Sequence, residues 1–233
     1  MSDLVYGGIS AASLGIHISG EGTYSSPERD REMISVDGRN GDLIIDNGRY
    51  ENIRVVYPAF MRDGFRLRES EIRNRFMNGS RGYRRLSDTY HPNEFRLAIF
   101  DGAFQPETGP WNASAHFDLV FNCKPQRFLV AGEETRTFRT AGTLNNPSQE
   151  TALPLIRVYG FGTLTVGDTV VTITQHGQQY MDIDCELGDA YCGSINLNAY
   201  VTKSFPTLGA GETGLAFSGN ITRVDITPHW WRV

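Results

Sequence analysis

Three carboxylates alternate along one short segment, in which Ile183 and Cys185 separate Asp182, Asp184 and Glu186. In a strand, this spacing puts all three carboxylates on one face. Such a face could bind calcium, which takes several oxygen ligands, or supply the acid and base of a glycoside hydrolase. Calcium sites usually draw on loops, however, and nothing here distinguishes an acid from a base. A solvated polar face is the favoured interpretation, and a glycan hydrolase is the weakest functional hypothesis.

Other residue patterns that could indicate an enzyme are also weak or absent. The histidines are scattered along the chain at His17, His91, His116, His176 and His229. No nucleophile and base occur at a recognisable spacing, so acyl transfer has no support. The segment 209–214 reads G-x-G-x-x-G, but Leu215-Ala216-Phe217 predicts a strand after it, where a dinucleotide site needs a helix. We therefore expect no enzyme, no cofactor and no metal site.

Arginine is concentrated in one stretch. Only two of the 22 basic residues are lysines, Lys124 and Lys203, and eight arginines fall between Arg62 and Arg85, for a local net charge of +5. The candidate interface residues are Arg66, Arg68, Arg73, Arg75, Arg81, Arg84 and Arg85. Arginine favours paired, stacked and interfacial contacts, so a subunit interface is the preferred interpretation. A solvated surface and a nucleic-acid surface remain alternatives, the latter weakened by the overall charge of -5.

Two adjacent tryptophans, Trp230 and Trp231, close the sequence. Neighbouring residues of a strand face opposite ways, so if one indole points inward the other points outward. The outward tryptophan is a candidate contact for a glycan or a protein partner.

The elements that must position these residues are mostly strands. Hydrophobic residues alternate at 53–57, 95–99 and 117–123, which is typical of half-buried strands. Further strands are expected at 155–159, 163–166, 169–174, 180–186, 195–202, 214–218 and 221–227, with Gly167-Asp168 as a hairpin turn. Six Asn-Gly or Asp-Gly pairs, at 37, 40, 47, 63, 78 and 101, predict turns with two positive φ angles, several of them closing hairpins. One helix is expected at about 69–78, capped by Ser70 and ended by Asn78-Gly79.

The composition fits a folded β protein. With 233 residues, 39% hydrophobic and 21% charged, the chain can bury a large core and is not of a disordered type. A polar connection around Leu144–Ser148 divides it into two β domains, 1–134 and 135–233, with net charges of -3 and -2. No apolar run of 18 residues and no signal peptide is recognisable, and three cysteines suggest free thiols in a reducing compartment.

The order of several motifs resembles the distal tail proteins of siphophages, prophages and related tail-like particles. The matching segments are Val36–Leu43, Tyr83–Pro92, Phe117–Arg127, Asn146-Pro147, Pro154–Gly160, Tyr180–Cys185, Phe205-Pro206 and Ile226–Trp231. Each is weak alone, but their order and spacing cover nearly the whole chain.

This resemblance implies a mainly β fold in two parts. The N-terminal part would be a β-sandwich or split barrel with one short helix and a hairpin arm, and it would form the ring, or belt. The C-terminal part would be a galectin-like β-sandwich. No catalytic residue is implied.

The resemblance also implies a structural role at the virion tail tip, after synthesis in the bacterial host cytoplasm. A homohexameric ring, in some cases stacked, would join the tail-tube protein to a tail-associated hub or fibre protein, and in some phages to a receptor-binding protein. DNA would only pass through the ring, and no membrane would be bound. The alternative function is a carbohydrate-binding module that recognises host cell-wall glycan through its C-terminal sandwich.

Overall fold

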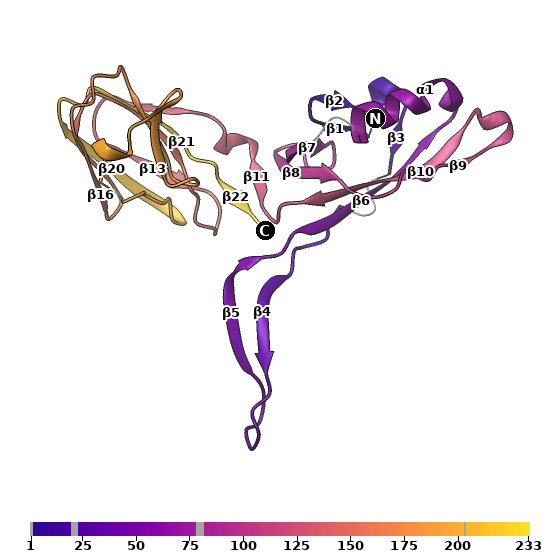
Figure 1. Cartoon of the computed structure of the whole chain (residues 1–233), viewed down its shortest axis with the longest axis horizontal. Coiled ribbons are helices and arrows are strands. Elements are labelled where there is room, and N and C mark those ends of the chain that lie inside the picture. The colour runs from indigo at the N-terminus through magenta and orange to yellow at the C-terminus, as the bar shows by residue number, and fades with distance from the viewer. Residues whose placement is uncertain (1, 20–22, 78–81, 203) are drawn as a thin grey trace. The chain divides into compact units, whose positions relative to one another are not determined.

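The computed structural model describes residues 2–19, 23–77, 82–202 and 204–233. The chain forms two compact units, Met1–Arg127 with Val233, and Phe128–Arg232 (Figure 1). The division falls at 127/128, before the expected 134/135. The reason is local, because residues 128–134 bond to the end of the chain: Leu129 N–H donates to Trp230 O, and His229 N–H donates to Gly132 O.

The first unit is built on one antiparallel sheet with the strand order β2-β1-β7-β8-β10-β6-β3. Its strands are β1 Leu4–Tyr6, β2 Ile9–Ser10, β3 His17–Ile18, β6 Ile53–Met61, β7 Arg84–Asp88, β8 Glu94–Phe100 and β10 Ala115–Cys123, with β9 Glu107–Thr108 paired to β10. The longest pairing joins β6 and β10 from Ala115↔Met61 to Cys123↔Ile53. The predicted alternation in β6 and β10 is confirmed. In β8 it is wrong beyond Phe95, because Leu97 and Ile99 are half-buried and Ala98 between them is fully buried.

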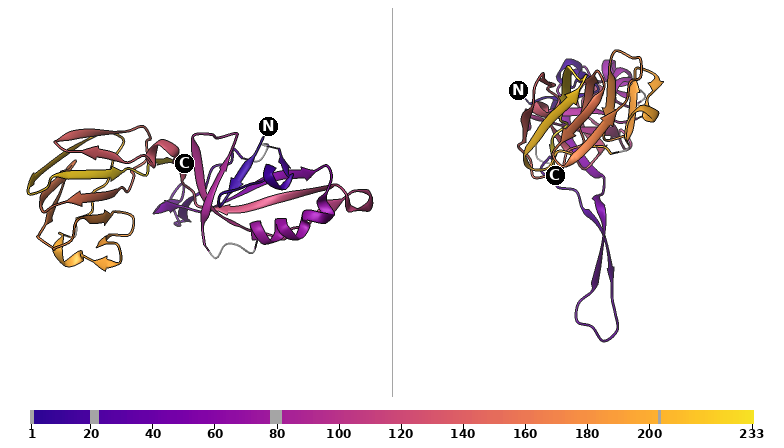
Figure 2. Two further views of the ribbon diagram at one scale, coloured as in Figure 1. Left: turned by 90° about the horizontal axis from the view of Figure 1, so that it is seen from above. Right: turned by 90° about the vertical axis from the view of Figure 1, so that its left-hand side faces the viewer.

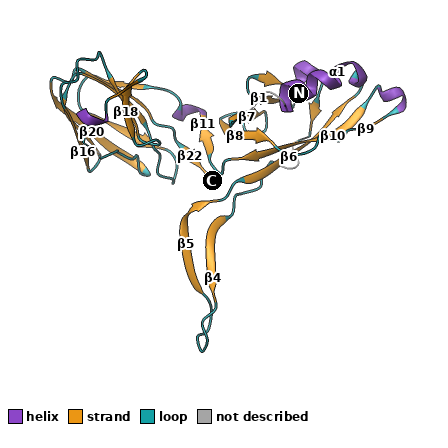
Figure 3. Ribbon diagram, viewed as in Figure 1, coloured by secondary structure: helices purple, strands orange, loops and turns teal. Residues whose placement is uncertain are grey.

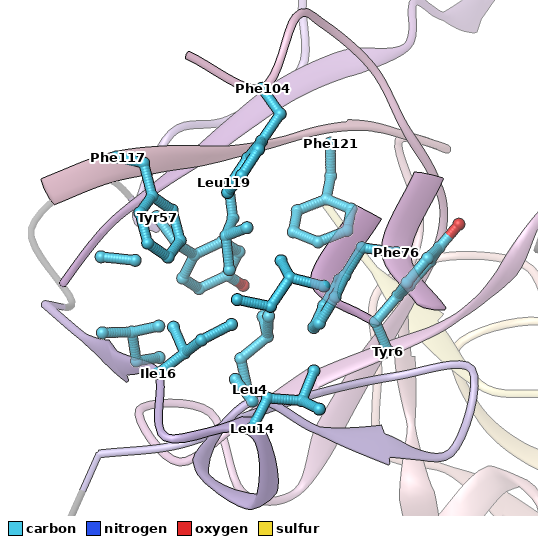
Figure 4. Close-up of a cluster of buried hydrophobic side chains, with 14 of the residues drawn as sticks. Leu4, Tyr6, Leu14, Ile16, Tyr57, Phe76, Phe104, Phe117, Leu119 and Phe121 are labelled. Carbon is cyan, nitrogen blue, oxygen red and sulfur yellow. The ribbon is translucent and has the colours of Figure 1, made fainter. Parts of the chain in front are cut away.

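Several aromatic side chains pack together in the core of this unit (Figure 4). Tyr6 lies 5.0 Å from Phe121 and 6.1 Å from Phe76, measured between ring centroids. Phe104 and Phe117 make an edge-to-face pair at 4.9 Å. Because Phe76 follows the helix, these contacts hold the helical segment against the sheet.

The helix begins earlier than the sequence indicated. Helix α1 spans Phe65–Ile72, and a π-helical turn, Arg73–Met77, continues it. Its N-terminal cap is Gly64 at φ 69°, while Ser70 lies within the helix, so the Ser70 cap was wrong. The helix starts at Phe65 because that buried ring packs 6.1 Å from Phe117. The expected exit at Asn78-Gly79 lies outside the described residues.

A two-stranded ribbon, here called the arm, leaves the first unit (Figures 1 and 2). It consists of β4 Arg29–Ile34 and β5 Leu43–Tyr50, which pair only with each other. Gly38 and Gly41 supply the positive φ angles in its tip, but Asp37 and Asn40 do not. Gly48 lies inside β5, beside a register shift in β4, so this Asn-Gly pair marks an irregularity and not a hairpin turn.

Other dipeptides also differ from the expected turn type. Among the described residues, no Asn or Asp of these pairs has a positive φ, so the prediction of two positive φ angles was wrong. The Asp63-Gly64 pair leads into α1, and Asp101-Gly102 follows β8. In each described pair only the glycine takes the left-handed region, which a Cβ disfavours.

The second unit is a sandwich of two antiparallel sheets. One sheet has the order β12-β21-β14-β17-β18-β19, with β12 Arg136–Phe138, β21 Arg223–Thr227, β14 Leu155–Tyr159, β17 Met181–Asp184, β18 Asp189–Cys192 and β19 Ile195–Asn196. The other has the order β13-β20-β15-β16, with β13 Gly142–Asn146, β20 Gly211–Gly219, β15 Gly162–Val166 and β16 Thr169–Ile173. β11 Arg127–Leu129 pairs with β22 Trp231–Arg232. The mainly β fold class is confirmed (Figure 3).

Two details of the second unit were predicted and two were not. The Gly167-Asp168 hairpin is present, and the strand predicted at Leu215-Ala216-Phe217 is part of β20, which begins earlier, at Gly211. The expected strand 195–202 is wrong, because β19 gives way to a 3₁₀ turn, Asn198–Tyr200. The expected connection at Leu144–Ser148 is wrong as well, because β13 runs to Asn146, whose buried amide donates to the carbonyls of Glu150 and Leu208.

The remaining short helices are 3₁₀ turns at Ala12–Leu14, Pro110–Asn112 and Val130–Gly132. Within the described ranges, no helix has both the length and the apolar character needed to cross a membrane.

Candidate interaction surfaces

The arm carries a ladder of charged side chains across its two strands. Arg29 contacts Asp46 at 2.7 Å, and Arg49 contacts Asp30 at 2.6 Å. Asn47 also donates to Asp30, at 2.9 Å. The hydrogen bond from Asn47, and then that from Arg49, lower the pKa of Asp30. The Gly48 N–H, and then Arg29, lower the pKa of Asp46. These contacts fix the register of a ribbon that has no sheet beside it.

The distal part of the arm is unusually apolar for an exposed ribbon. Five side chains there are 40–60% exposed: Met33, Val36, Leu43, Ile44 and Ile45. Leu43, Ile44 and Ile45 are consecutive, so both faces of β5 present aliphatic groups. A lone two-stranded ribbon is marginally stable in water. The arm therefore has the composition of a segment that is covered by another surface.

An exposed tryptophan occupies the loop between β9 and β10. Trp111 is 92% exposed and adopts φ 54°, a left-handed conformation that costs a non-glycine residue about 1–2 kcal/mol. Asn112 has φ 56° as well. The loop is held by a hydrogen bond from Gly109 N–H to Ser114 O and one from Ala113 N–H to Pro110 O. A rigid loop that displays an indole in a strained conformation is a candidate binding anchor.

The same loop is tied to the start of α1. Phe65 N–H donates to Ala113 O at 3.0 Å. Two residues further along, Leu67 is 88% exposed. Among the described residues, Trp111 and Leu67 are the two most exposed large hydrophobic side chains. Figure 1 shows α1 and the loop between β9 and β10 at the same end of the first unit. We call this end the Trp111 surface, and define it as Trp111, Leu67 and the exposed residues of α1.

The predicted arginines divide between two elements. On and after α1, Arg73 pairs with Glu69, and Arg75 pairs with Glu71 at 2.9 Å. Arg73 also lies 5.5 Å from the centre of the Phe104 ring. Arg66 and Arg68 are exposed on α1. The helix therefore leaves a positive surface beside Leu67.

The other predicted arginines lie elsewhere. Arg84 and Arg85 are on β7, where Arg85 stacks on Phe95 at 3.8 Å from the ring centre. The Arg84 side chain packs beside Gly7. Arg81 lies outside the described residues. The described members of the set therefore lie on two elements, the helical segment and β7.

The two tryptophans near the end of the chain differ in burial: Trp230 is buried and Trp231 is half-buried. Trp230 is buried in the core of the second unit, below a groove of about 350 Å³ that it lines with Arg136 and Phe138. Trp231 is half-buried, and its indole N–H donates to Thr151 O at 3.0 Å. Trp230 has no exposed ring face for stacking on a sugar, so only Trp231 keeps partial access.

The three alternating carboxylates do not act together. Asp182 is buried and accepts two hydrogen bonds from Arg157, at 2.7 and 2.9 Å, which raise the pKa of Arg157. Asp184 caps the turn that follows β17 by accepting from the N–H groups of Glu186 and Leu187. Within the described part of the chain, no group of three or more His, Cys, Asp or Glu side chains is placed to hold a metal ion.

The cysteines are free thiols. Cys123 and Cys185 are buried and Cys192 is half-buried. Burial raises the pKa of both Cys123 and Cys185 to about 12, so neither is a reactive thiolate at neutral pH.

Sequence reasoning missed Trp111, Leu67 and the apolar residues of the arm. The available signal was a bulky aromatic residue between Pro110 and Asn112, inside a turn sequence where water-exposed polar residues are usual. Leu67 is harder to find, because its exposure depends on where α1 begins.

Comparison with known proteins gives matches by structure only. No protein-family profile and no curated protein sequence matches the chain. The crystal structure of the SPP1 Dit (gp 19.1) protein, described as a paradigm of the hub adsorption apparatus in phages that infect Gram-positive bacteria, matches with a TM-score of 0.74 and 12% identity. The match covers 97% of this chain and 98% of that one.

Two structures of the phage p2 baseplate in its activated conformation match more loosely. The structure with Ca has a TM-score of 0.53 and 9% identity, over 97% of each chain. The structure with Sr has a TM-score of 0.50 and 8% identity, over 97% of this chain and 98% of that one. At such identities the likeness establishes the fold, and it does so over nearly the whole length. The mainly β, Dit-like fold that the sequence motifs imply is confirmed.

Proposed function

We propose that this protein is a structural distal tail hub of a siphophage or prophage, and not an enzyme. The single observation that carries the proposal is the likeness to the SPP1 Dit hub protein over 97% of this chain. In this role, copies of the chain form a ring, taken here as a hexamer, at the tail tip. The ring joins the tail tube to the tail-associated hub or fibre protein, and DNA passes through it.

Two surfaces of the first unit support the proposal of ring closure. The distal arm, residues 32–46, combines exposed aliphatic groups with four carboxylates against one arginine, Arg39. The Trp111 surface combines two exposed apolar side chains with the exposed Arg66 and Arg68. The two surfaces are therefore complementary in charge, and both offer apolar area for burial. We propose that the arm of one copy packs against the Trp111 surface of the next copy.

A matched pair of substitutions tests this assignment. Ile44 is 55% exposed on the arm, and Val170 is 52% exposed on β16 of the second unit. Ile44→Glu should shift the protein from rings to smaller species in mass photometry, because a carboxylate would be buried at the interface without a partner. Val170→Glu, which changes the surface equally, should leave the rings intact. Equal assembly of both variants would remove the arm from the interface.

A further inference from the structure

A row of polar side chains crosses the outer face of the six-stranded sheet in the second unit. The strand registers place Thr137 opposite Asp225, Asp225 opposite Arg157, Arg157 opposite Asp182, and Asp182 opposite Tyr191. One row therefore spans five strands, from β12 to β18. The side chains between these positions, such as Ile156, Ile183 and Val224, face the core.

A groove of about 200 Å³ lies along this row. It is lined by Thr135, Leu155, Arg157, Asp182, Asp225 and Thr227, which come from β21, β14, β17 and the residue before β12. Ligand pockets for drug-sized molecules are usually larger, about 300–1,000 Å³, so this groove suits one small ring at a time. Its walls contain donors, acceptors and one aliphatic side chain.

The polar groups of the groove are already held in place. Asp182 is only 4% exposed and accepts from two nitrogens of Arg157, while the Tyr180 ring lies 4.1 Å below the guanidinium. Thr137 donates to Asp225 at 2.8 Å, and the hydroxyls of Thr135 and Thr227 are 3.0 Å apart. Fixed side chains lose little conformational entropy when a ligand binds.

The buried Asp182 carboxylate on the outer face of the sheet is not explained by fold stability alone. A buried ion pair is often no more stabilising than apolar residues of the same volume. The Arg157 side chain stays 40% exposed above Asp182, with more N–H donors than the two that Asp182 accepts. The buried Asp182 carboxylate thus orients the Arg157 guanidinium, which stays exposed on the strand next to Asp225.

The charge of the groove limits the ligand. Its lining has two carboxylates against one guanidinium, Asp225 also contacts Arg223 at 3.3 Å, and the unit around the groove has 10 acidic and 6 basic residues. The groove carboxylates are thus paired with guanidinium groups, and the net negative charge of the unit disfavours phosphates and carboxylates. Carboxylates and threonine hydroxyls instead suit a ligand with several hydroxyls, each able to donate and to accept. The Leu155 side chain offers apolar contact for the C–H face of a ring.

We infer that this groove, bounded by Arg157, Asp225, Thr227 and Leu155, binds a neutral sugar ring of a surface glycan. The inference goes beyond the proposed hub role and does not depend on ring assembly. It also places glycan contact on the sheet face and away from Trp230.

Saturation-transfer difference NMR on the full chain tests the inference. The probes are the methyl glycosides of glucose, galactose and N-acetylglucosamine, with glycerol phosphate as the anionic probe. At least one glycoside should receive saturation, and its binding should change little between 50 and 300 mM salt, because a neutral ligand releases no counterions. Glycerol phosphate should receive none.

Matched variants localise the site. Asp225→Ala should weaken glycoside binding by about tenfold or more, since a charged hydrogen-bond acceptor is lost. Thr227→Val keeps the side-chain shape and should weaken it severalfold. Glu212→Ala removes a carboxylate from β20 of the other sheet and should leave binding unchanged. Thermal unfolding of each variant confirms the fold. No saturation of any glycoside, equal binding by wild type and both groove variants, or tighter binding of glycerol phosphate would overturn the inference.

Discussion

Replacing Trp111 by glycine should affect the fold and the assembly in opposite directions. The backbone at Trp111 has φ 54° and ψ 19°, which costs a residue with a Cβ about 1–2 kcal/mol. Glycine removes that cost but loses about 0.5–1 kcal/mol through its larger unfolded-state entropy. The side chain itself contributes little to the fold, because it is 92% exposed. The net expectation is a gain of about 0.5–1 kcal/mol in the free energy of unfolding.

The effect on assembly should be larger and of opposite sign. An aromatic side chain buries about 150–250 Å². At about 25 cal/mol per Å², complete burial of the indole in a subunit contact gives an upper bound of about 4–6 kcal/mol. Interface anchors typically lose about 2–4 kcal/mol on truncation, or roughly 30- to 700-fold in affinity for each contact.

Two measurements on the same sample separate these effects. Thermal unfolding of Trp111→Gly should show a midpoint unchanged or a few degrees higher, and mass photometry should show the ring population shifted to smaller species. Leu187→Ser is the control, because Leu187 is 71% exposed in the second unit and should change neither reading. A lower midpoint with an unchanged distribution of species would refute the reasoning and make Trp111 a structural residue of its loop.

Three further predictions concern the fold. The pKa values of Asp30 and Asp46 are lowered in the folded arm, so their stabilising contribution is complete above the unfolded value of 3.8 and is lost as the pH falls through the lower folded values. The amide protection factors across β4 and β5, which are corrected for the pH dependence of intrinsic exchange, should therefore stay constant from pH 7 to 4 and fall below that. Cys192 should react with iodoacetamide at pH 8 well before Cys123, whose pKa is about 12, and equal rates would show that the first core opens readily. Gly162→Ala should cost about 3 kcal/mol or more in denaturant unfolding, because its Cβ would lie 2.1 Å from Ser218 O at φ +147°.

Local patterns predicted local structure well. The alternation in β6 and β10 determined which residues face the core, since a strand buries every second side chain. The Gly167-Asp168 turn was also found, because a two-residue loop depends on its own residues. By contrast, Ser70 has the chemistry of a helix cap, but the burial of Phe65 against Phe117 moved the start of α1 upstream.

The candidate surfaces were less accessible to sequence reasoning. The arginine stretch was visible, but its division between α1 and β7 depends on the fold. Asp182 has the spacing of an exposed strand carboxylate, yet it is buried because Arg157 on the neighbouring strand covers it. Burial of Trp230 likewise depends on the position of its segment beside Gly132, where an added Cβ would lie 2.5 Å from Trp230 N. Such contacts join residues far apart in sequence, and no short motif encodes them.

Negative-stain electron microscopy of the purified full chain tests the central claim most directly. The hub assignment predicts rings with a central opening in the wild type, and single small particles for Ile44→Glu and Trp111→Gly under the same conditions. Wild-type protein that stays as single particles at every concentration, or rings that persist unchanged in both variants, would contradict an assembly built from the arm and the Trp111 surface.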